Sequence, residues 1–144
     1  MAIFSVFLLF GGPAFAEEEK EFARRIMDEL DVDKKGYANK KDIEVFSRKE
    51  FIAMDKNKNN LVSKEEFFEY VCDKSCKEGN CECKSYKNKQ DLSYINEYWN
   101  RVDADGNGSI NRQEKLANDM ETFYNLDYDG NGKITKEEIE AQLY

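Results

Sequence analysis

The chain of 144 residues contains no histidine and a single proline, Pro13. Without histidine the protein lacks the usual general base, the histidine-based catalytic triads and the ligands of most zinc enzymes. One proline near the N-terminus leaves no proline-rich linker between domains. Basic residues number 22 against 30 acidic ones, and the formal net charge of −8 argues against nucleic acid as a partner. The length fits one small domain or two half-size lobes.

Two twelve-residue segments, 103–114 and 127–138, repeat one pattern of oxygen-bearing residues with glycine at position six and isoleucine at position eight. A calcium ion needs about six to eight oxygens, and a tight loop brings them together from alternating positions. The predicted ligands are Asp103, Asp105, Asn107, Ser109 (through its carbonyl), Asn111 (through water), Glu114, Asp127, Asp129, Asn131, Lys133 (through its carbonyl), Thr135 and Glu138.

On these two segments the sequence resembles an EF-hand protein of the calmodulin superfamily. The resemblance implies an all-α fold of tandem helix–loop–helix units, Ca²⁺ as the bound ion, and short β-bridges between paired loops. It covers most of the chain after residue 20, because two weaker copies of the loop precede the strong pair.

Segment 55–66 is the better of the two weaker copies. Asn60 replaces glycine at position six, and asparagine tolerates the left-handed backbone better than other residues with a side chain. Only two of the predicted ligands are carboxylates, so we expect weaker binding here. These ligands are Asp55, Asn57, Asn59, Leu61 (through its carbonyl), Ser63 and Glu66.

Segment 31–42 departs furthest from the pattern. Lys35 stands where an oxygen is needed, and Ala38 replaces the larger aliphatic residue of the bridge. Asp42 is a shorter twelfth residue than glutamate. Because a lysine side chain can only donate hydrogen bonds, we expect this loop to bind no metal or to bind it weakly, with Asp31, Asp33 and Asp42 as doubtful ligands.

The loops begin at residues 31, 55, 103 and 127. Between the loops of each half there is room for one helix of about 18 Å, at 1.5 Å per residue. A single helix therefore leaves one loop and enters the next, which places the two loops at its opposite ends. We predict instead that loop 55–66 pairs with loop 103–114 through Val62 and Ile110, and that loop 31–42 pairs with loop 127–138.

Apolar residues at helical spacing predict helices on both sides of each loop. The predicted helices cover residues 17–30, 43–54, 67–71, 91–102, 116–126 and 137–143. The predicted organisation is a signal peptide over 1–16, an N-terminal EF-hand pair over 17–71, a cysteine-rich linker over 72–90 and a C-terminal EF-hand pair over 91–144.

The first 16 residues have the pattern of a secretory leader. An apolar run over 3–10 is followed by Gly11-Gly12-Pro13 and then by Ala14-Phe15-Ala16, a small-x-small cleavage site. A membrane anchor or a buried helix is the alternative, but a spanning helix needs roughly 20 apolar residues, and Gly-Gly-Pro interrupts the run. We expect cleavage after Ala16 and a secreted protein, although the leader has no lysine or arginine before its apolar run.

The four cysteines lie close together, at Cys72, Cys76, Cys81 and Cys83. In a secreted chain an even, clustered count predicts disulfides. Cys81 and Cys83 are too close to bond to each other easily, which leaves two pairings: 72–81 with 76–83, or 72–83 with 76–81. A four-thiolate zinc site is the alternative, but the spacing lacks the paired C-x2-C elements of such sites.

These observations favour a secreted, non-enzymatic calcium-binding protein with a structural or buffering role. The alternative is an extracellular calcium sensor that binds a partner protein, which usually requires a methionine-rich surface. An enzyme with regulatory EF-hands is excluded by size, because the loops and their helices use nearly the whole chain. We expect a monomer with no membrane span after cleavage.

Overall fold

The structure is a computed structural model that describes residues 16–77 and 93–142. Its helices are α2 (Ala16–Leu30), α3 (Lys40–Met54), α4 (Lys64–Lys77), α6 (Ser93–Val102), α7 (Arg112–Leu126) and α8 (Lys136–Ala141). Its strands are β1 (Ala38–Asn39), β2 (Val62–Ser63), β3 (Ser109–Ile110) and β4 (Lys133–Ile134). The predicted all-α fold of helix–loop–helix units with short bridges is confirmed. Within the described ranges, no helix combines the length and the apolar character that a membrane span requires.

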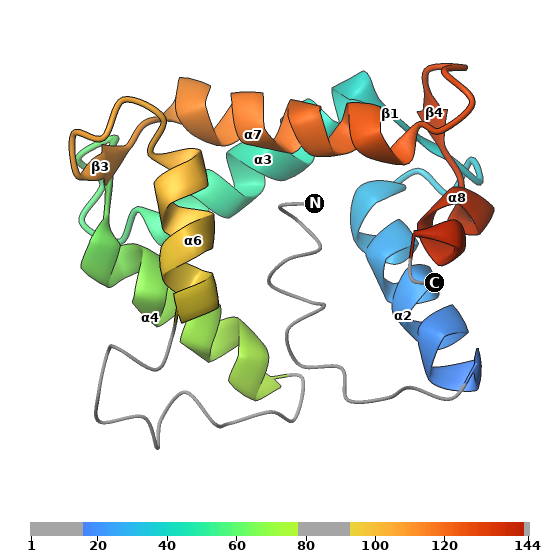
Figure 1. Ribbon diagram of the computed structural model, residues 1–144, viewed down its shortest axis with the longest axis horizontal. Coiled ribbons are helices and arrows are strands. Elements are labelled where there is room, and N and C mark those ends of the chain that lie inside the picture. The colour runs from blue at the N-terminus through green and yellow to red at the C-terminus, as the bar shows by residue number, and fades with distance from the viewer. Residues whose placement is uncertain (1–15, 78–92, 143–144) are drawn as a thin grey trace.

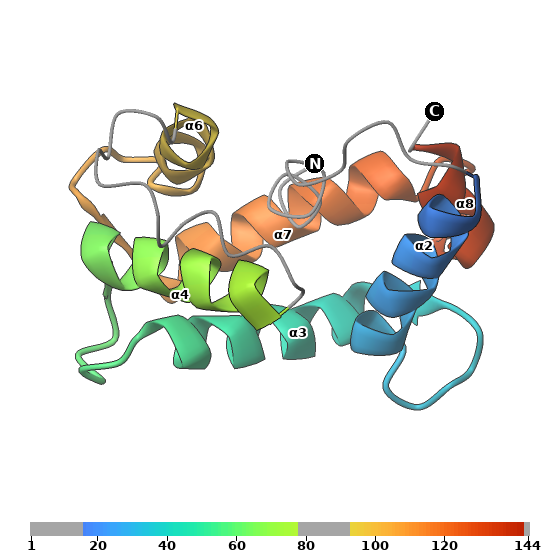
Figure 2. The ribbon, with the colours of Figure 1, turned by 90° about the horizontal axis from the view of Figure 1, so that it is seen from below.

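Helices α3 and α7 lie side by side and connect the two ends of the molecule (Figure 1). One end is formed by α4 and α6, and the other by α2 and α8, as the second view also shows (Figure 2). Each connecting helix is 15 residues long. Each begins within the last residues of one loop and ends directly before the next, so the prediction that one helix serves two loops is confirmed.

The strands pair across the two halves of the sequence. In one pair Val62 lies opposite Ile110, and in the other Ala38 lies opposite Ile134. Both pairs are antiparallel. We refer to residues 31–42, 55–66, 103–114 and 127–138 as loops 1 to 4. The prediction that loop 2 pairs with loop 3, and loop 1 with loop 4, is therefore confirmed.

Each loop pair has its own hydrophobic core. The loop 2–3 core consists of Phe51, Met54, Val62, Phe67, Val71, Ile95, Tyr98, Trp99, Val102 and Ile110. The loop 1–4 core consists of Ala23, Ile26, Met27, Leu30, Ala38, Ile43, Phe46, Phe123, Leu126, Ile134 and Ile139. Both cores combine residues from the two halves of the sequence, and α3 contributes to both, because its two ends reach different loop pairs.

Buried polar groups join α7 to α3, and α4 to α3. The ammonium of Lys115, only 1% exposed, donates to Glu50 on α3 at 3.1 Å and to Asp119 on α7. The Tyr70 hydroxyl of α4 donates to Glu50 at 3.0 Å. Burial lowers the pKa of Lys115, but the neighbouring carboxylates more than offset it, and the pKa lies above its ordinary value. The side chain therefore stays charged inside the protein.

The cysteine region is described only in part. Cys72 and Cys76 lie on α4, one helical turn apart, and Cys72 is half-buried against the loop 2–3 core. Cys81 and Cys83 lie outside the described residues, as does most of the predicted leader. The disulfides, the signal peptide and the division into an N-terminal and a C-terminal pair remain predictions.

Candidate metal centres

The first aspartate of loops 2 and 3 organises the turn that follows it, at positions five and six. In loop 3, Asp103 Oδ1 accepts the Asn107 N–H at 3.1 Å and Oδ2 accepts the Gly108 N–H at 3.0 Å. In loop 2 the same two bonds reach Asp55, from Asn59 at 3.1 Å and from Asn60 at 2.9 Å. Because this carboxylate holds the backbone of positions five and six, the loop curls around the place where the other ligand positions converge.

Two positions in each loop have a left-handed backbone, whereas the sequence pattern predicts it only at position six. Asn60 does take that conformation, with φ 65°, as expected from its place in the pattern. Position four takes it as well: φ is 67° at Gly106 and 69° at Gly130, but 59° at Lys58. Side chains disfavour this conformation. The repeated Gly-Asn-Gly of loops 3 and 4 was the signal that the sequence offered.

The residue at position nine caps the helix that leaves the loop. The Asn111 side-chain oxygen accepts the N–H groups of Gln113 at 2.8 Å and Glu114 at 3.0 Å, and Glu114 Oε2 accepts the Asn111 N–H at 2.9 Å. Thr135 and Glu138 form the same reciprocal capping box in loop 4. The Thr-x-x-Glu spacing was a readable capping signal. Since the Asn111 oxygen already has two donors, contact with a metal through water suits it better than direct ligation.

Positions five and seven are joined by a hydrogen bond in loops 2, 3 and 4. The Asn107 side-chain oxygen accepts the Ser109 N–H, and the Asn131 oxygen accepts the Lys133 N–H. Ser109 and Lys133 both belong to the bridging strands. In loop 2 the Asn59 oxygen accepts the Leu61 N–H at 2.8 Å in the same way. These bonds turn the chain at position seven, from which a carbonyl ligand is expected.

Two groups of three carboxylates meet inside loops 3 and 4. In each group one oxygen from each residue lies within 4.8 Å of the others. The groups are Asp103, Asp105 and Glu114, and Asp127, Asp129 and Glu138. Like charges this close disfavour one another unless a cation lies between them. A hard divalent cation with oxygen ligands fits this donor set.

Loop 4 also contains a buried oxygen without a donor. Asp127 Oδ2 accepts the Gly132 N–H at 2.9 Å, whereas Asp127 Oδ1 is buried and has no hydrogen-bond partner. A buried polar atom left unpaired costs about 1–3 kcal/mol. The two lysines of loop 4 do not supply the charge, because Lys133 lies over the Tyr37 ring and Lys136 pairs with Glu140. A bound cation would satisfy this oxygen, so the residues of loop 4 fit the metal that the pattern implies.

Loop 2 brings fewer charges together. Glu66 Oε1 accepts the Asn57 N–H at 3.1 Å, and Oε2 accepts the Ser63 N–H at 2.9 Å. Burial raises the pKa of Glu66, but these backbone hydrogen bonds outweigh it, and the pKa lies below its ordinary value. Asp55 and Glu66 both hold backbone N–H groups of loop 2, and the loop lacks the third carboxylate found in loops 3 and 4.

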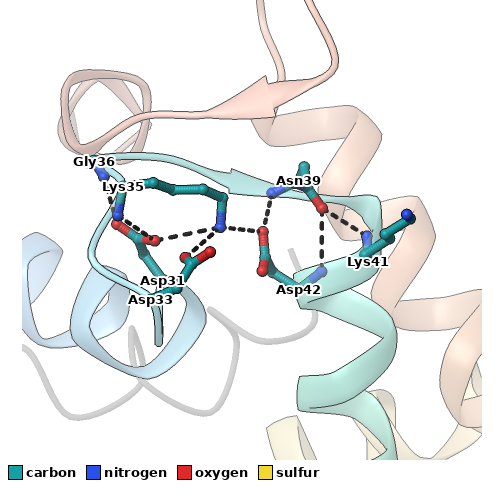
Figure 3. A network of polar contacts seen from close by, with 7 residues as sticks. All are labelled: Asp31, Asp33, Lys35, Gly36, Asn39, Lys41 and Asp42. Atoms are coloured by element: carbon teal, nitrogen blue, oxygen red, sulfur yellow. Dashed lines mark hydrogen bonds and ion pairs between the residues drawn. The ribbon is translucent and has the colours of Figure 1, made fainter.

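Loop 1 already contains a cation of its own. The Lys35 ammonium lies 2.7 Å from Asp33, 2.8 Å from Asp42 and 3.4 Å from Asp31 (Figure 3). Hydrogen bonds to Asp33 and Asp42 raise the pKa of Lys35 above its ordinary value. The three doubtful ligands of the sequence analysis do converge, but they converge on a side chain of the protein.

Two segments of the chain, residues 48–67 and 120–143, match a family model described as "EF hand". The first contains loop 2 with the adjoining parts of α3 and α4, and the second contains loop 4 with the adjoining parts of α7 and α8. No curated protein and no solved structure matches the chain. Together with the carboxylate groups of loops 3 and 4, these matches support an EF-hand calcium-binding protein.

Proposed function

We propose that this protein is a secreted, non-enzymatic calcium-binding protein that holds Ca²⁺ in loops 3 and 4 and, more weakly, in loop 2. The observation that carries the proposal is the convergence of three carboxylates inside each of loops 3 and 4. The unpaired, buried Asp127 Oδ1 adds a second reason, because it needs a positive partner that the loop does not provide.

The proposed role is structural or buffering. Residues 91–144 carry 12 acidic and 5 basic side chains, so the charge excess lies with the two strong loops. Calcium would stabilise this part of the chain by removing repulsion among its carboxylates. Extracellular modules bind calcium at about 10⁻⁴–10⁻³ M, which matches the free calcium outside cells. At that affinity the sites would stay largely filled.

Secretion and disulfides are part of the same proposal. They are supported by the leader-like residues 1–16 and by four clustered cysteines. Two disulfides from Cys72 and Cys76 would tie the end of α4 to the segment that leads to α6. N-terminal sequencing of the secreted protein should begin at Glu17, and thiol alkylation should require prior reduction. A chain that stays in the cell, or four thiols that react without reduction, would contradict this part.

A calcium sensor with a partner protein is the second candidate. Two apolar side chains on α3, Val45 and Ile52, are 60% and 59% exposed and would suit a contact surface. The methionines argue against a sensor, because Met27 and Met54 are buried in the two cores and Met120 packs against one of the cores. A fluorescent hydrophobic probe should show little calcium-dependent change if the role is buffering, whereas a large rise would favour the sensor.

A calcium titration followed through Trp99 tests the proposed function. Trp99 is the only tryptophan, is 3% exposed, and lies in the loop 2–3 core with Ile110 of loop 3. We expect a saturable fluorescence change that a chelator reverses, and retention of calcium by native mass spectrometry. A Glu114→Gln variant should shift the Trp99 response to higher calcium. A flat titration with no calcium retained would refute the proposal.

A further inference from the structure

Loop 1 is folded like a calcium loop although it carries a lysine at position five. Asp31 Oδ1 accepts the Lys35 N–H at 3.1 Å, and Asp31 Oδ2 accepts the Gly36 N–H at 2.6 Å. Asp103 of loop 3 makes the equivalent two bonds. Loop 1 also keeps the capping box, here between Asn39 and Asp42. The backbone therefore retains the calcium-loop conformation where the ligand pattern is broken.

The Lys35 ammonium takes the place of the ion in this arrangement. It reaches the side chains of positions one, three and twelve, which are the three carboxylate positions that form the groups in loops 3 and 4. The Lys35 side chain is 20% exposed and those of Asp31 and Asp42 are 8% and 19% exposed, so these two ion pairs are partly shielded from water, whereas Asp33 is 66% exposed. Figure 3 shows the Lys35 ammonium among these three carboxylates, where its charge neutralises their mutual repulsion. In the proposed function a calcium ion has this role in loops 3 and 4.

Loop 1 is in direct contact with loop 4. Strands β1 and β4 pair, with Asn39 opposite Lys133, and the Lys133 ammonium lies 4.4 Å from the centre of the Tyr37 ring. Ala38 and Ile134 are fully buried in the loop 1–4 core. Lys133 is also the position-seven residue of loop 4, whose carbonyl is a predicted ligand. The conformation of loop 1 therefore bears directly on the metal position of loop 4.

We propose that Lys35 is a built-in replacement for calcium that keeps loop 1 folded and the β1–β4 bridge formed in the absence of the ion, and so pre-organises loop 4. The inference rests on the proposed calcium function only for its effect on loop 4. A pre-organised site binds more tightly, because less ordering accompanies binding. Loop 4 should therefore bind one ion without cooperativity, since its partner loop is always filled.

Amide hydrogen exchange in β1 and β4, measured with a chelator present, tests the calcium-independent part. The full chain is compared with Lys35→Met and with Lys34→Met, a neighbouring exposed lysine whose loss makes the same charge change. We expect β1 and β4 to exchange slowly in the wild type and in Lys34→Met, and at least about tenfold faster in Lys35→Met, because three carboxylates then face one another. Equal exchange in all three proteins would overturn the proposal.

A second variant guards against a Lys35→Met protein that fails to fold. Lys35→Asn restores the residue found at position five in the other three loops, at Asn59, Asn107 and Asn131. In the chelator its β1 and β4 amides should exchange fast, and calcium should restore slow exchange and add one ion to the count by native mass spectrometry. Slow exchange in the chelator would overturn the proposal.

The effect on loop 4 is measured separately. Calcium titration followed at the Gly132 amide should give a Hill coefficient near one in the wild type. The calcium affinity of loop 4 should be about tenfold lower in Lys35→Met. The calcium affinity of loop 3, followed at the Gly108 amide, should stay the same. An unchanged Gly132 titration would overturn the pre-organisation of loop 4. If the wild type binds no calcium, the proposed function fails, but the exchange comparison still decides what Lys35 does.

Discussion

Loops 1 and 4 are neighbours with nearly the same backbone conformation, but their carboxylates are neutralised differently. At position six φ is 88° at Gly36 and 81° at Gly132, and a β-bridge joins the two loops. Loop 1 neutralises its carboxylates with Lys35, whereas loop 4 leaves Asp127 Oδ1 buried and unpaired. The two loops thus share a backbone conformation but differ at the centre: the carboxylates of loop 1 are paired with a lysine of the chain, whereas a buried oxygen of loop 4 has no donor among the described residues.

The opposite end of the molecule gives a second comparison. There loops 2 and 3 both have an oxygen-bearing residue at position five, and Arg112 of loop 3 donates to the Asn60 side chain of loop 2 at 2.9 Å. Both members of this pair depend on an external ion in the proposed function. Calcium bound in loop 3 should therefore raise the affinity of the weaker loop 2, whereas loop 4 has no second ion beside it to couple to.

The largest expected effect comes from the buried ion pairs of Lys115, one of which joins α7 to α3. Lys115→Met leaves the carboxylates of Glu50 and Asp119 buried without their cation. Removing one partner of a buried ion pair typically costs about 3–5 kcal/mol, so we expect a loss of that size in the free energy of unfolding, measured in urea through Trp99. Asp119→Asn is the control and should cost less, because the Lys115–Glu50 pair remains. A loss below about 1 kcal/mol for Lys115→Met would show that the two ends do not depend on this contact.

The next largest effect concerns the calcium affinities of loops 3 and 4, which should change independently of each other. Glu138→Gln and Glu114→Gln each remove the carboxylate at position twelve, and fewer charged ligands lower calcium affinity. We expect each substitution to lower the calcium affinity of its own site by about 10- to 100-fold or more. Substitution of a residue that only contacts a metal ligand already causes losses of that size. Titration at the Gly132 and Gly108 amides reports the two sites separately. Equal weakening of both sites by either variant would contradict the separation of the two ends.

The smallest effect tests whether loops 1 and 4 share one backbone. Gly36→Ala and Gly132→Ala place a Cβ where no atom lies within 4 Å, so the cost comes from the left-handed backbone alone. That conformation costs about 1–2 kcal/mol for a residue with a side chain. Thermal unfolding in a chelator should show similar losses for both variants. A loss confined to Gly132→Ala would mean that loop 1 relaxes easily and that Lys35 holds it only loosely.

The pairing of the loops was predictable because it follows from the number of residues between them. Loop starts at 31, 55, 103 and 127 leave room for only one helix within each half, which was enough to predict the pairing of Val62 with Ile110. Lys115 was not predictable, because a lysine that follows a loop ordinarily indicates a solvent-exposed position. Only the folded chain shows that α3 places Glu50 beside it.

The role of Lys35 was predictable only in part. Its charge at a ligand position predicts that loop 1 is a poor calcium site, and this remains a prediction. That its ammonium reaches Asp31, Asp33 and Asp42 together depends on the loop being already curled, which is a property of the backbone hydrogen bonds and not of the residue type. The left-handed backbone at Lys34 and Lys58 was missed for a similar reason, since lysine gives no local signal for it.

The most direct test of the account is the number of calcium ions that the protein retains in native mass spectrometry as calcium is raised. We predict two ions at low calcium, for loops 3 and 4, and a third at higher calcium, for loop 2. Glu138→Gln should lower the count at low calcium by one, and Asp33→Asn in loop 1 should leave every count unchanged. Retention of no ion, or of a fourth ion that Asp33→Asn removes, would contradict the account.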